Sequence, residues 1–455
     1  MKITTNLQWM EADFIEASKF FQNTEELDVT HSHCEDGTVM FDSVCIADKR
    51  YEYSKDIGET DDLEKKRYVK RYAKLSLYKS LSDYLGQRLV WGALTGIRPV
   101  KYAYSIGENW REKMADEMMV DESKLDIVGR IIEEQKGIYE LKENNCDFFV
   151  SIPFCPSRCM YCSFLSNEIG KEKHLDGYID ALVKEIESAK PLIKNLRSVY
   201  VGGGTPVSLP LPMLERVLKA IGRVDCEYTV EAGRPDVIER ETLELLKKYG
   251  VTRICINPQT FNDKTLKVIG RRHTAEDIYK KYELAKEFGF IVNMDLIAGL
   301  TGESFEDFKF SVDKAIELSP DNITVHTLSL KRGSKLKETT DRLAEGEIAK
   351  MIDYSVYRLI NSGFNPYYMY RQRYMAGNLE NTGYTKKGKA CYYNVDVMEE
   401  ISDNLACGAN AVTKKLIVSE NRIERYGAPK DIKTYIDKID KIIEEKNKFF
   451  LDNSL

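Results

Sequence analysis

The chain has 455 residues, which is too long for one small core and predicts two or three domains. A hydrophobic fraction of 43% and a charged fraction of 31% are typical of a globular protein, and the net charge of −6 gives no reason to expect a nucleic-acid partner. Because the sequence has no stretch of about 18 apolar residues and no signal-peptide pattern, we expect no membrane span, and the ten cysteines favour a reducing cytoplasm over a disulfide framework.

Residues 1–57 predict a small α/β unit, with a helix over residues 14–21 and a strand over residues 38–46. His31, His33 and Cys34 lie close together in this segment. A metal site is conceivable here, but no fourth ligand is evident. The favoured interpretation is a turn that exposes both histidines to solvent.

A long helix is predicted over residues 62–90, because apolar residues recur on one face of a helical repeat. The opposite face is crowded with basic residues, namely Lys65, Lys66, Arg67, Lys70, Arg71 and Lys74. They could bind an anionic partner, although a solvated helix face is the default. Two glycines and a proline in residues 91–99 then predict a shaped loop, in which Arg98 could meet a substrate carboxylate or an acid of its own domain.

Three cysteines, Cys155, Cys159 and Cys162, follow one another with three and then two residues between them. Three thiolates can hold three irons of a [4Fe–4S] cluster and leave the fourth iron open. An open iron can chelate the amino and carboxylate groups of S-adenosylmethionine (SAM), which one electron would cleave to methionine and a 5′-deoxyadenosyl radical. The alternatives are a partial zinc site or buried thiols without a role. No second close cysteine pair follows, as a zinc site would favour.

From residue 147 onward, short β-rich segments alternate with helices, which is the pattern of parallel β/α units. Strands are predicted near residues 147–152, 198–202, 226–231, 252–257, 290–296 and 322–328. The helix after the cysteines has its apolar residues on one face, at Leu175, Tyr178, Ile179, Leu182, Val183 and Ile186. Six such units suit a partial (β/α)₆ barrel, in which we expect the chemistry at the carboxyl ends of the strands.

Glycine-rich and polar residues stand at these strand ends. After the second strand, Gly202 to Pro206 form a turn whose glycines allow a ligand to approach the backbone closely. Glu231 ends the third strand, where its carboxylate could accept hydrogen bonds from hydroxyl groups or form a surface salt bridge. Polar residues after or within later strands are Gln259, Arg271, Arg272 and Asp295.

Together these motifs resemble the radical SAM superfamily. The flanks of the cysteines, residues 152–154 and 161–164, resemble its oxygen-independent coproporphyrinogen III oxidase or dehydrogenase family, the HemN/HemW/HemZ group. The resemblance implies that the cluster is held by Cys155, Cys159 and Cys162. It also implies that SAM is bound by Tyr161, Gly203, Gly204, Thr205, Glu231, Gln259, Arg271 and Asp295.

The resemblance further implies oxidative decarboxylation of coproporphyrinogen III to protoporphyrinogen IX in haem biosynthesis. Its cofactors would be a [4Fe–4S] cluster and SAM, and an electron donor such as flavodoxin or ferredoxin would be needed. A haem chaperone of the HemW type and a radical SAM enzyme that modifies haem are the alternatives. Candidate anchors for the carboxylates of a tetrapyrrole are Arg98, Arg271, Arg272, Arg371 and Arg373.

Three domains are expected: an N-terminal α/β domain of residues 1–145, a partial barrel of residues 146–335, and a C-terminal α/β extension of residues 336–455 that completes the barrel side. Residues 366–378 interleave aromatic residues with arginines and resemble the HemZ type. This segment suits either a flat, acidic tetrapyrrole or a strand packed on the barrel. Phe149 stands where the family has a tyrosine. Only about 44 residues follow Ala411, too few for the winged domain that closes HemN and HemW.

Overall fold

The computed structural model describes residues 1–94, 96–162, 167–329, 345–372, 379–420 and 422–451. The chain divides into two compact units, of which the first is Met1–Gly129 and the second begins at Arg130. The expected division into three domains stays a prediction. None of the helices in the described ranges combines the length and the apolar character that a bilayer crossing requires.

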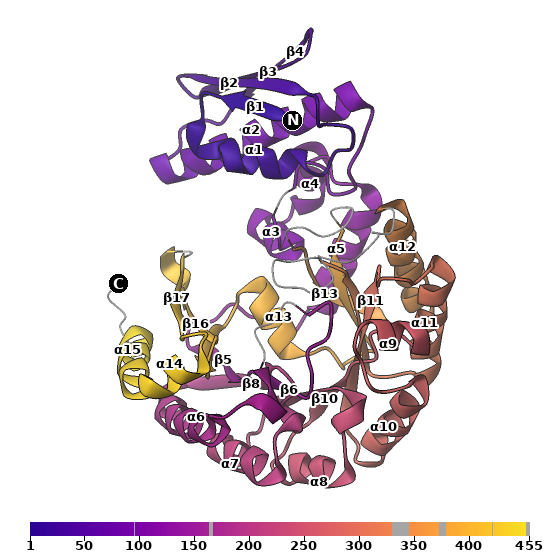
Figure 1. The fold of residues 1–455 in the computed structure, drawn as a ribbon. Coiled ribbons are helices and arrows are strands. Elements are labelled where there is room, and N and C mark those ends of the chain that lie inside the picture. Colours follow the sequence, from indigo (N-terminus) through magenta and orange to yellow (C-terminus); the bar gives the residue numbers. More distant parts are fainter. Residues whose placement is uncertain (95, 163–166, 330–344, 373–378, 421, 452–455) are drawn as a thin grey trace. The chain divides into compact units, whose positions relative to one another are not determined.

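The first unit is a four-stranded sheet with two helices on one face (Figure 1). The sheet order is β1-β2-β3-β4, in which β1 is parallel to β2 and the other pairs are antiparallel. These elements are β1 (Lys2–Thr5), α1 (Glu11–Ser18), β2 (Asp28–Asp36), β3 (Val39–Ile46), β4 (Lys49–Asp56) and α2 (Asp62–Leu85). The predicted strand and long helix are confirmed, whereas the first helix begins and ends three residues earlier than expected.

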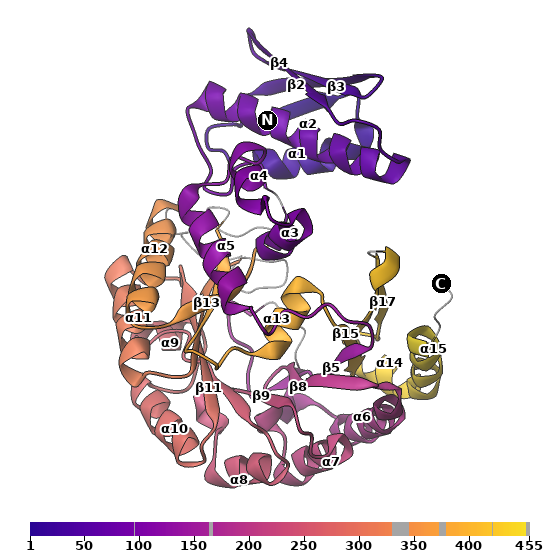
Figure 2. The same cartoon turned by 180° about the vertical axis from the view of Figure 1, so that it is seen from behind.

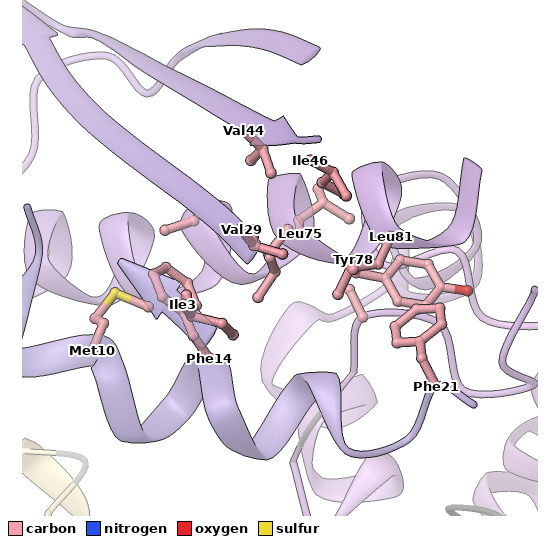
Figure 3. Close-up of a cluster of buried hydrophobic side chains, with 13 residues drawn as sticks. Ile3, Met10, Phe14, Phe21, Val29, Val44, Ile46, Leu75, Tyr78 and Leu81 are labelled. Carbon is pink, nitrogen blue, oxygen red and sulfur yellow. The ribbon is translucent and has the colours of Figure 1, made fainter. Parts of the chain in front are cut away.

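The core of this unit lies between the sheet and helix α2. Val29 and Val44 project from the strands toward Leu75 of the helix, and all three are buried (Figure 3). Helix α2 begins where the Asp61 side chain accepts a hydrogen bond from a backbone amide of the first turn. It ends at Gly86, whose φ of 62° stops the helix before the predicted residue 90.

The two histidines of the first unit are buried in strand β2, so the expected solvent-exposed turn is wrong. Side chains alternate along a strand, which places His31 and His33 on the inner face and Cys34 on the exposed face. Both imidazoles meet the carboxylate of Asp42 on β3, with His33 Nδ1 at 2.7 Å and His31 Nε2 at 3.3 Å from Oδ1. The Ser76 hydroxyl donates to the other carboxylate oxygen at 3.0 Å. One buried carboxylate therefore organises a polar cluster inside this core.

The segment predicted as a shaped loop precedes three shorter helices, and residue 95 of that segment lies outside the described residues. A side chain at Gly92 would place its Cβ 2.0 Å from the Met118 carbonyl oxygen, so this loop requires glycine there. Pro99 ends the loop by occupying the first turn of the next helix, where its missing amide costs nothing. The helices are α3 (Pro99–Ile106), α4 (Trp110–Asp116) and α5 (Glu122–Glu134).

The second unit is built on a sheet of eleven strands, of which the middle six are parallel neighbours in chain order. These six are β5 (Asn145–Ile152), β8 (Asn195–Gly203), β9 (Glu227–Gly233), β10 (Arg253–Ile256), β11 (Ile291–Ala298) and β12 (Asn322–Thr327). Helices that follow these strands line the outer side of the curved sheet (Figure 1), namely α6 (Leu175–Ala189), α7 (Leu211–Ile221), α8 (Arg240–Lys248), α10 (Ala275–Glu287), α11 (Phe305–Leu318) and α12 (Glu345–Asn361). The short helix α9 (Asp263–Val268) lies in the connection between β10 and α10. The predicted partial (β/α)₆ barrel is confirmed.

The C-terminal segments extend this sheet at both edges. Strand β14 pairs antiparallel with β12, and β15 pairs parallel with β5. Helix α13 lies on the concave side of the sheet in both views (Figures 1 and 2). These elements are β13 (Asn365–Tyr370), β14 (Asn381–Thr385), α13 (Tyr392–Glu399), β15 (Asp403–Cys407), β16 (Val412–Ile417), β17 (Arg422–Gly427), α14 (Ile432–Asp437) and α15 (Ile439–Leu451). The short strands β6 (Phe154–Cys155) and β7 (Asn167–Glu168) flank the cysteine loop.

Candidate active site

A cavity of about 410 Å³ lies within the second unit. It is lined by residues that follow the barrel strands and by the loop that carries the three cysteines. All eleven residues predicted to bind the cluster or SAM line this one cavity: Tyr161, Gly203, Gly204, Thr205, Glu231, Gln259, Arg271, Asp295, Cys155, Cys159 and Cys162. The structure therefore brings the predicted set together, while the role of each residue stays a prediction.

The glycine-rich turn after β8 is locked against the start of the cysteine loop. A side chain at Gly204 would place its Cβ 2.4 Å from the Phe154 carbonyl oxygen, so only glycine fits. The next amide, of Thr205, donates to the same carbonyl at 2.7 Å. The Thr205 hydroxyl lies 3.5 Å from the Cys155 sulfur as a donor. This contact fixes the first cysteine relative to the turn.

The three cysteines fit an iron–sulfur cluster. No three histidine, cysteine, aspartate or glutamate side chains among the described residues converge on the position of a single metal ion. Each protein ligand of a [4Fe–4S] cluster binds a different iron, so its sulfurs are spread around the cluster rather than converging on one atom. Donors also approach two of the sulfurs, from the Thr205 hydroxyl to Cys155 and from Arg234 Nη1 at 3.7 Å to Cys159. Such donors stabilise the negative charge that cysteine sulfur carries as a ligand.

Arg271 joins three parts of the cavity wall. Its Nη2 donates to the Tyr161 hydroxyl at 2.7 Å, and its Nη1 lies 3.2 Å from the Gly233 carbonyl and 3.3 Å from the Asn257 carbonyl. Burial opposes its charge, but Tyr161 and Cys159 outweigh burial and raise the pKa of Arg271. For Tyr161, by contrast, burial itself raises the pKa. The guanidinium is thus a fixed positive charge beside the cysteine loop.

The carboxyl group of Glu231 has a pKa near neutral pH. Its Oε1 accepts a hydrogen bond from the Tyr200 hydroxyl, and its Oε2 lies 3.4 Å from the Asn257 side-chain nitrogen. Burial raises the pKa of Glu231 to about 7, and repulsion from Asp295 acts in the same direction. The group can therefore change its charge when a cationic or hydroxyl-bearing ligand binds.

Gln259 has an unusual backbone conformation at the end of β10. Its φ is +68°, and its backbone is held by hydrogen bonds to the Asp295 carbonyl at 2.8 Å and from the Ile297 amide at 3.0 Å. Left-handed conformations are uncommon for residues other than glycine and cluster at functional sites. Three buried oxygens in this wall have no hydrogen-bond partner among the described residues: Gln259 Oε1, Asn257 Oδ1 and Thr229 Oγ1. Such acceptors suit the ammonium and ribose hydroxyls of SAM.

Several cavity residues were missed by the sequence analysis, namely Tyr200, Arg234, Asn257 and His326, whereas Tyr370 lies in the aromatic segment of residues 366–378 that was singled out. Arg234 and Asn257 directly follow strands, and that position could have identified them. His326 and Tyr370 meet across β12 and β13, with His326 Nδ1 3.3 Å from the Tyr370 hydroxyl. No local pattern in the sequence predicts this contact, because β13 follows β12 only after a long stretch of chain and β14 lies between the two strands in the sheet.

The candidate anchors for a tetrapyrrole are placed differently. Arg271 lines the cavity, whereas Arg272 is exposed and Arg371 is buried, and neither belongs to the described cavity lining. Burial lowers the pKa of Arg371 to about 10, against the attraction of Glu380. Arg373 lies outside the described residues, and Arg98 belongs to the first unit. Substrate binding by these arginines stays a prediction.

Comparison with known proteins agrees with this fold. A family model described as "Radical SAM superfamily" matches residues 149–315. The "Oxygen-independent coproporphyrinogen-III oxidase-like protein HemZ" of Bacillus subtilis is 32% identical over 422 residues, covering 87% of this chain and 83% of HemZ. The "Heme chaperone HemW" of Lactococcus lactis is 35% identical over 238 residues, covering 50% of this chain and 62% of HemW.

A solved structure shows the same fold. Coproporphyrinogen III oxidase (HemN) of Escherichia coli, described as a radical SAM enzyme, superposes with a TM-score of 0.54 at 22% identity, over 67% of this chain and 71% of that one. The curved parallel sheet and the cysteine-lined cavity are those of a radical SAM protein. Within that class, the chain belongs to the HemN/HemW/HemZ family. Its cofactors are a [4Fe–4S] cluster and SAM.

Proposed function

We propose that this protein catalyses the oxygen-independent oxidative decarboxylation of coproporphyrinogen III to protoporphyrinogen IX. In this reaction each of two propionates loses a hydrogen atom, CO₂ and one electron and becomes a vinyl group, so the proposal requires a one-electron acceptor besides SAM. The observation that carries the proposal is the convergence of all eleven predicted cofactor residues on one cavity. The HemZ relative, whose name describes it as coproporphyrinogen-III oxidase-like, supports the substrate because the similarity covers 87% of the chain.

The residues of the cavity have separate tasks in this proposal. When bound, the cluster and SAM supply the one-electron chemistry that activates a carbon–hydrogen bond. Cys155, Cys159 and Cys162 hold the cluster in a loop that the glycine-rich turn fixes through Phe154. The turn residues Gly203, Gly204 and Thr205 lie against the amino-acid part of SAM, where the two glycines let the backbone approach it closely.

The opposite walls orient the rest of SAM. Glu231 accepts hydrogen bonds from the ribose, and its neighbours Tyr200 and Asn257 hold the carboxylate in place. Gln259 and Asp295 continue this wall, since the Gln259 amide donates to the Asp295 carbonyl. Arg271, hydrogen-bonded to Tyr161, provides a cation for a carboxylate group.

An aromatic wall supports a flat substrate. Tyr368 and Tyr370 of β13 form part of the cavity lining, and their ring centroids lie 6.4 Å apart with an angle of 6° between the ring planes. Such rings suit a tetrapyrrole, whose pyrrole rings are large and apolar. The proposal also requires an external electron donor such as flavodoxin or ferredoxin.

A second candidate is haem binding and delivery, because the similarity to the haem chaperone HemW reaches 35% identity. The same cavity could then hold cofactors while haem binds the protein without being converted. Modification of haem is the third possibility carried by the family resemblance. These functions differ in what happens to the tetrapyrrole, so one experiment separates them.

That experiment is anaerobic reconstitution with SAM, a reductant and coproporphyrinogen III, followed by mass spectrometry of the tetrapyrrole. We expect products that have lost one and then two molecules of CO₂, with SAM cleaved to methionine. A parallel sample receives haem in place of coproporphyrinogen. Intact haem that co-purifies with the protein, together with unchanged coproporphyrinogen, would reject the proposal in favour of the chaperone. A changed haem mass would indicate haem modification.

A further inference from the structure

Arg234, which immediately follows strand β9, extends its side chain to the cysteine loop. The residue is 3% exposed. Its Nη1 lies 3.1 Å from the Ser157 hydroxyl, 3.4 Å from the Ser157 carbonyl and 3.7 Å from the Cys159 sulfur. One nitrogen of the guanidinium therefore binds the loop and approaches a predicted cluster ligand.

The remaining nitrogens of Arg234 are held from the other side. Its Nε and Nη2 each donate to the Asp236 carboxylate at 2.8 Å, which is a two-bond pairing. His273 is a further neighbour, with Nδ1 3.7 Å from the same carboxylate. Although burial opposes it, these partners hold the pKa of Asp236 well below its usual range. The guanidinium is thus fixed in direction, because its planar fork cannot rotate without breaking both bonds.

The position of Arg234 differs from that of the other hydrogen-bond donors near the cysteine loop. The Thr205 hydroxyl, which approaches Cys155, is uncharged. Arg271 carries a charge, but its hydrogen bonds among the described residues go to the Tyr161 hydroxyl and to backbone carbonyls. Arg234 combines a full positive charge with a direct approach to cysteine sulfur.

Charge and hydrogen bonds at the sulfurs of an iron–sulfur cluster control its reduction potential. Reduction adds an electron, so a cation fixed beside a ligand sulfur stabilises the reduced form more than the oxidised form. We propose that Arg234 is a positioning residue that holds the Cys159 sulfur and raises the reduction potential of the cluster. The inference rests on the proposed ligation of the cluster by Cys155, Cys159 and Cys162, and it requires nothing about the substrate.

The test is the substitution Arg234→Gln in the full chain. The variant and the wild type are reconstituted anaerobically without SAM or tetrapyrrole, and their iron and sulfide contents are measured. The midpoint potential of the cluster is then determined by a redox titration monitored by electron paramagnetic resonance. We expect a more negative midpoint, with the ratio of reduced to oxidised cluster at least tenfold lower at a given potential. For a one-electron couple this corresponds to about 59 mV.

The matched control is Arg240→Gln, which removes the same charge from helix α8. The Arg240 side chain is exposed and pairs with Glu287 at the surface, where solvent and salt screen its charge. We expect a wild-type midpoint for this variant. An Arg234→Gln midpoint equal to those of the wild type and Arg240→Gln, at full iron content, would overturn the inference.

Two further outcomes are decisive. A folded Arg234→Gln variant that assembles no cluster, while Arg240→Gln assembles one, supports the holding role of Arg234. If Arg234→Gln does not fold, Arg234→Met is titrated instead, since methionine is also a long unbranched side chain but carries no charge. A lowered midpoint then supports the inference, and an unchanged one overturns it. The assignment of the three cysteines as cluster ligands has a test of its own. It would be rejected if a variant without these cysteines still held four irons.

Discussion

The substitution Glu231→Gln should weaken SAM binding and leave the cluster intact. The carboxylate lines the cavity between the Tyr200 hydroxyl and the Asn257 amide, and glutamine has nearly the same shape. Glutamine cannot carry the negative charge that strengthens a hydrogen bond from a ribose hydroxyl. The three cysteines lie in a different segment, so iron content should not change.

The size of the effect follows from the charge of the acceptor. A hydrogen bond to a charged group contributes about 1.5–3 kcal/mol. Since every 1.4 kcal/mol corresponds to a factor of ten, the dissociation constant should rise by about tenfold to hundredfold. Because burial raises the pKa of Glu231 to about 7, the full effect appears only above that pH, where the carboxylate is ionised.

This pKa gives the assay a second readout. A protonated Glu231 loses its negative charge, so the wild-type affinity for SAM should fall as the pH drops through about 7. The Glu231→Gln variant has no such group and should show a flat profile. Anaerobic equilibrium dialysis of SAM against reconstituted protein, from about pH 6 to about pH 8, measures both.

Tyr200→Phe provides a control that keeps the carboxylate. The Tyr200 hydroxyl donates to Glu231 and lowers the pKa of that group, so its removal should move the pH midpoint of SAM binding upward. If Glu231→Gln retains full iron, the wild-type dissociation constant and the wild-type pH profile, Glu231 is structural and the assignment of this wall to the ribose is wrong.

Replacement of Cys155, Cys159 and Cys162 by alanine should abolish the brown colour and SAM cleavage while the circular dichroism stays native; four irons per chain in that variant would contradict the ligand assignment. Gly204→Ala should lower the unfolding free energy by about 1–3 kcal/mol and reduce iron content, because the new Cβ would lie 2.4 Å from the Phe154 carbonyl oxygen. An unchanged midpoint of urea unfolding would argue against this tight contact. Glu303, which follows β11, is buried beside the Thr260 hydroxyl, and burial raises its pKa from 4.5 to about 7, so the wild-type free energy of unfolding should fall as the pH rises from about 4.5 to about 7. Glu303→Gln should show a smaller loss between about pH 5 and about pH 8 in urea titrations, and an equal loss would assign the pH dependence to other groups.

Much of the barrel was predictable because its signals are local. Strands such as β5 and β8 are buried on both faces and therefore appear as short apolar runs. In helix α6 the apolar residues that form the buried face recur at the spacing of a helical repeat.

The edges of the sheet and the buried histidines were not predictable in this way. Strand β15 pairs with β5 although more than 250 residues separate Asp403 from its partner Cys146. In the first unit, burial of His31 and His33 depends on the register of β2 against β3, which places Asp42 beside them. A pair of histidines near a cysteine carries no information about that register.

The same distinction applies inside the site. Glu231 and Gln259 end strands, where the barrel rule places functional residues. Tyr200 stands in the middle of β8, and only the register shows that it pairs with Phe149 and donates to Glu231. Phe149 has no hydroxyl, and the tyrosine that donates to Glu231 lies opposite it on the neighbouring strand.

The charges of the cavity bear on how a tetrapyrrole with several carboxylates could bind an acidic protein. The cavity-lining arginines already have partners, with Arg234 bound to Asp236 and Arg253 bound to Glu227. Two acids, Glu231 and Asp295, face the same space and favour the cationic SAM. Arg271 is the described lining arginine whose hydrogen bonds go to uncharged groups, so it can attract a carboxylate without giving up a salt bridge. The cavity is therefore suited to one propionate beside SAM, and the remaining carboxylates of the substrate must find their partners outside its described lining.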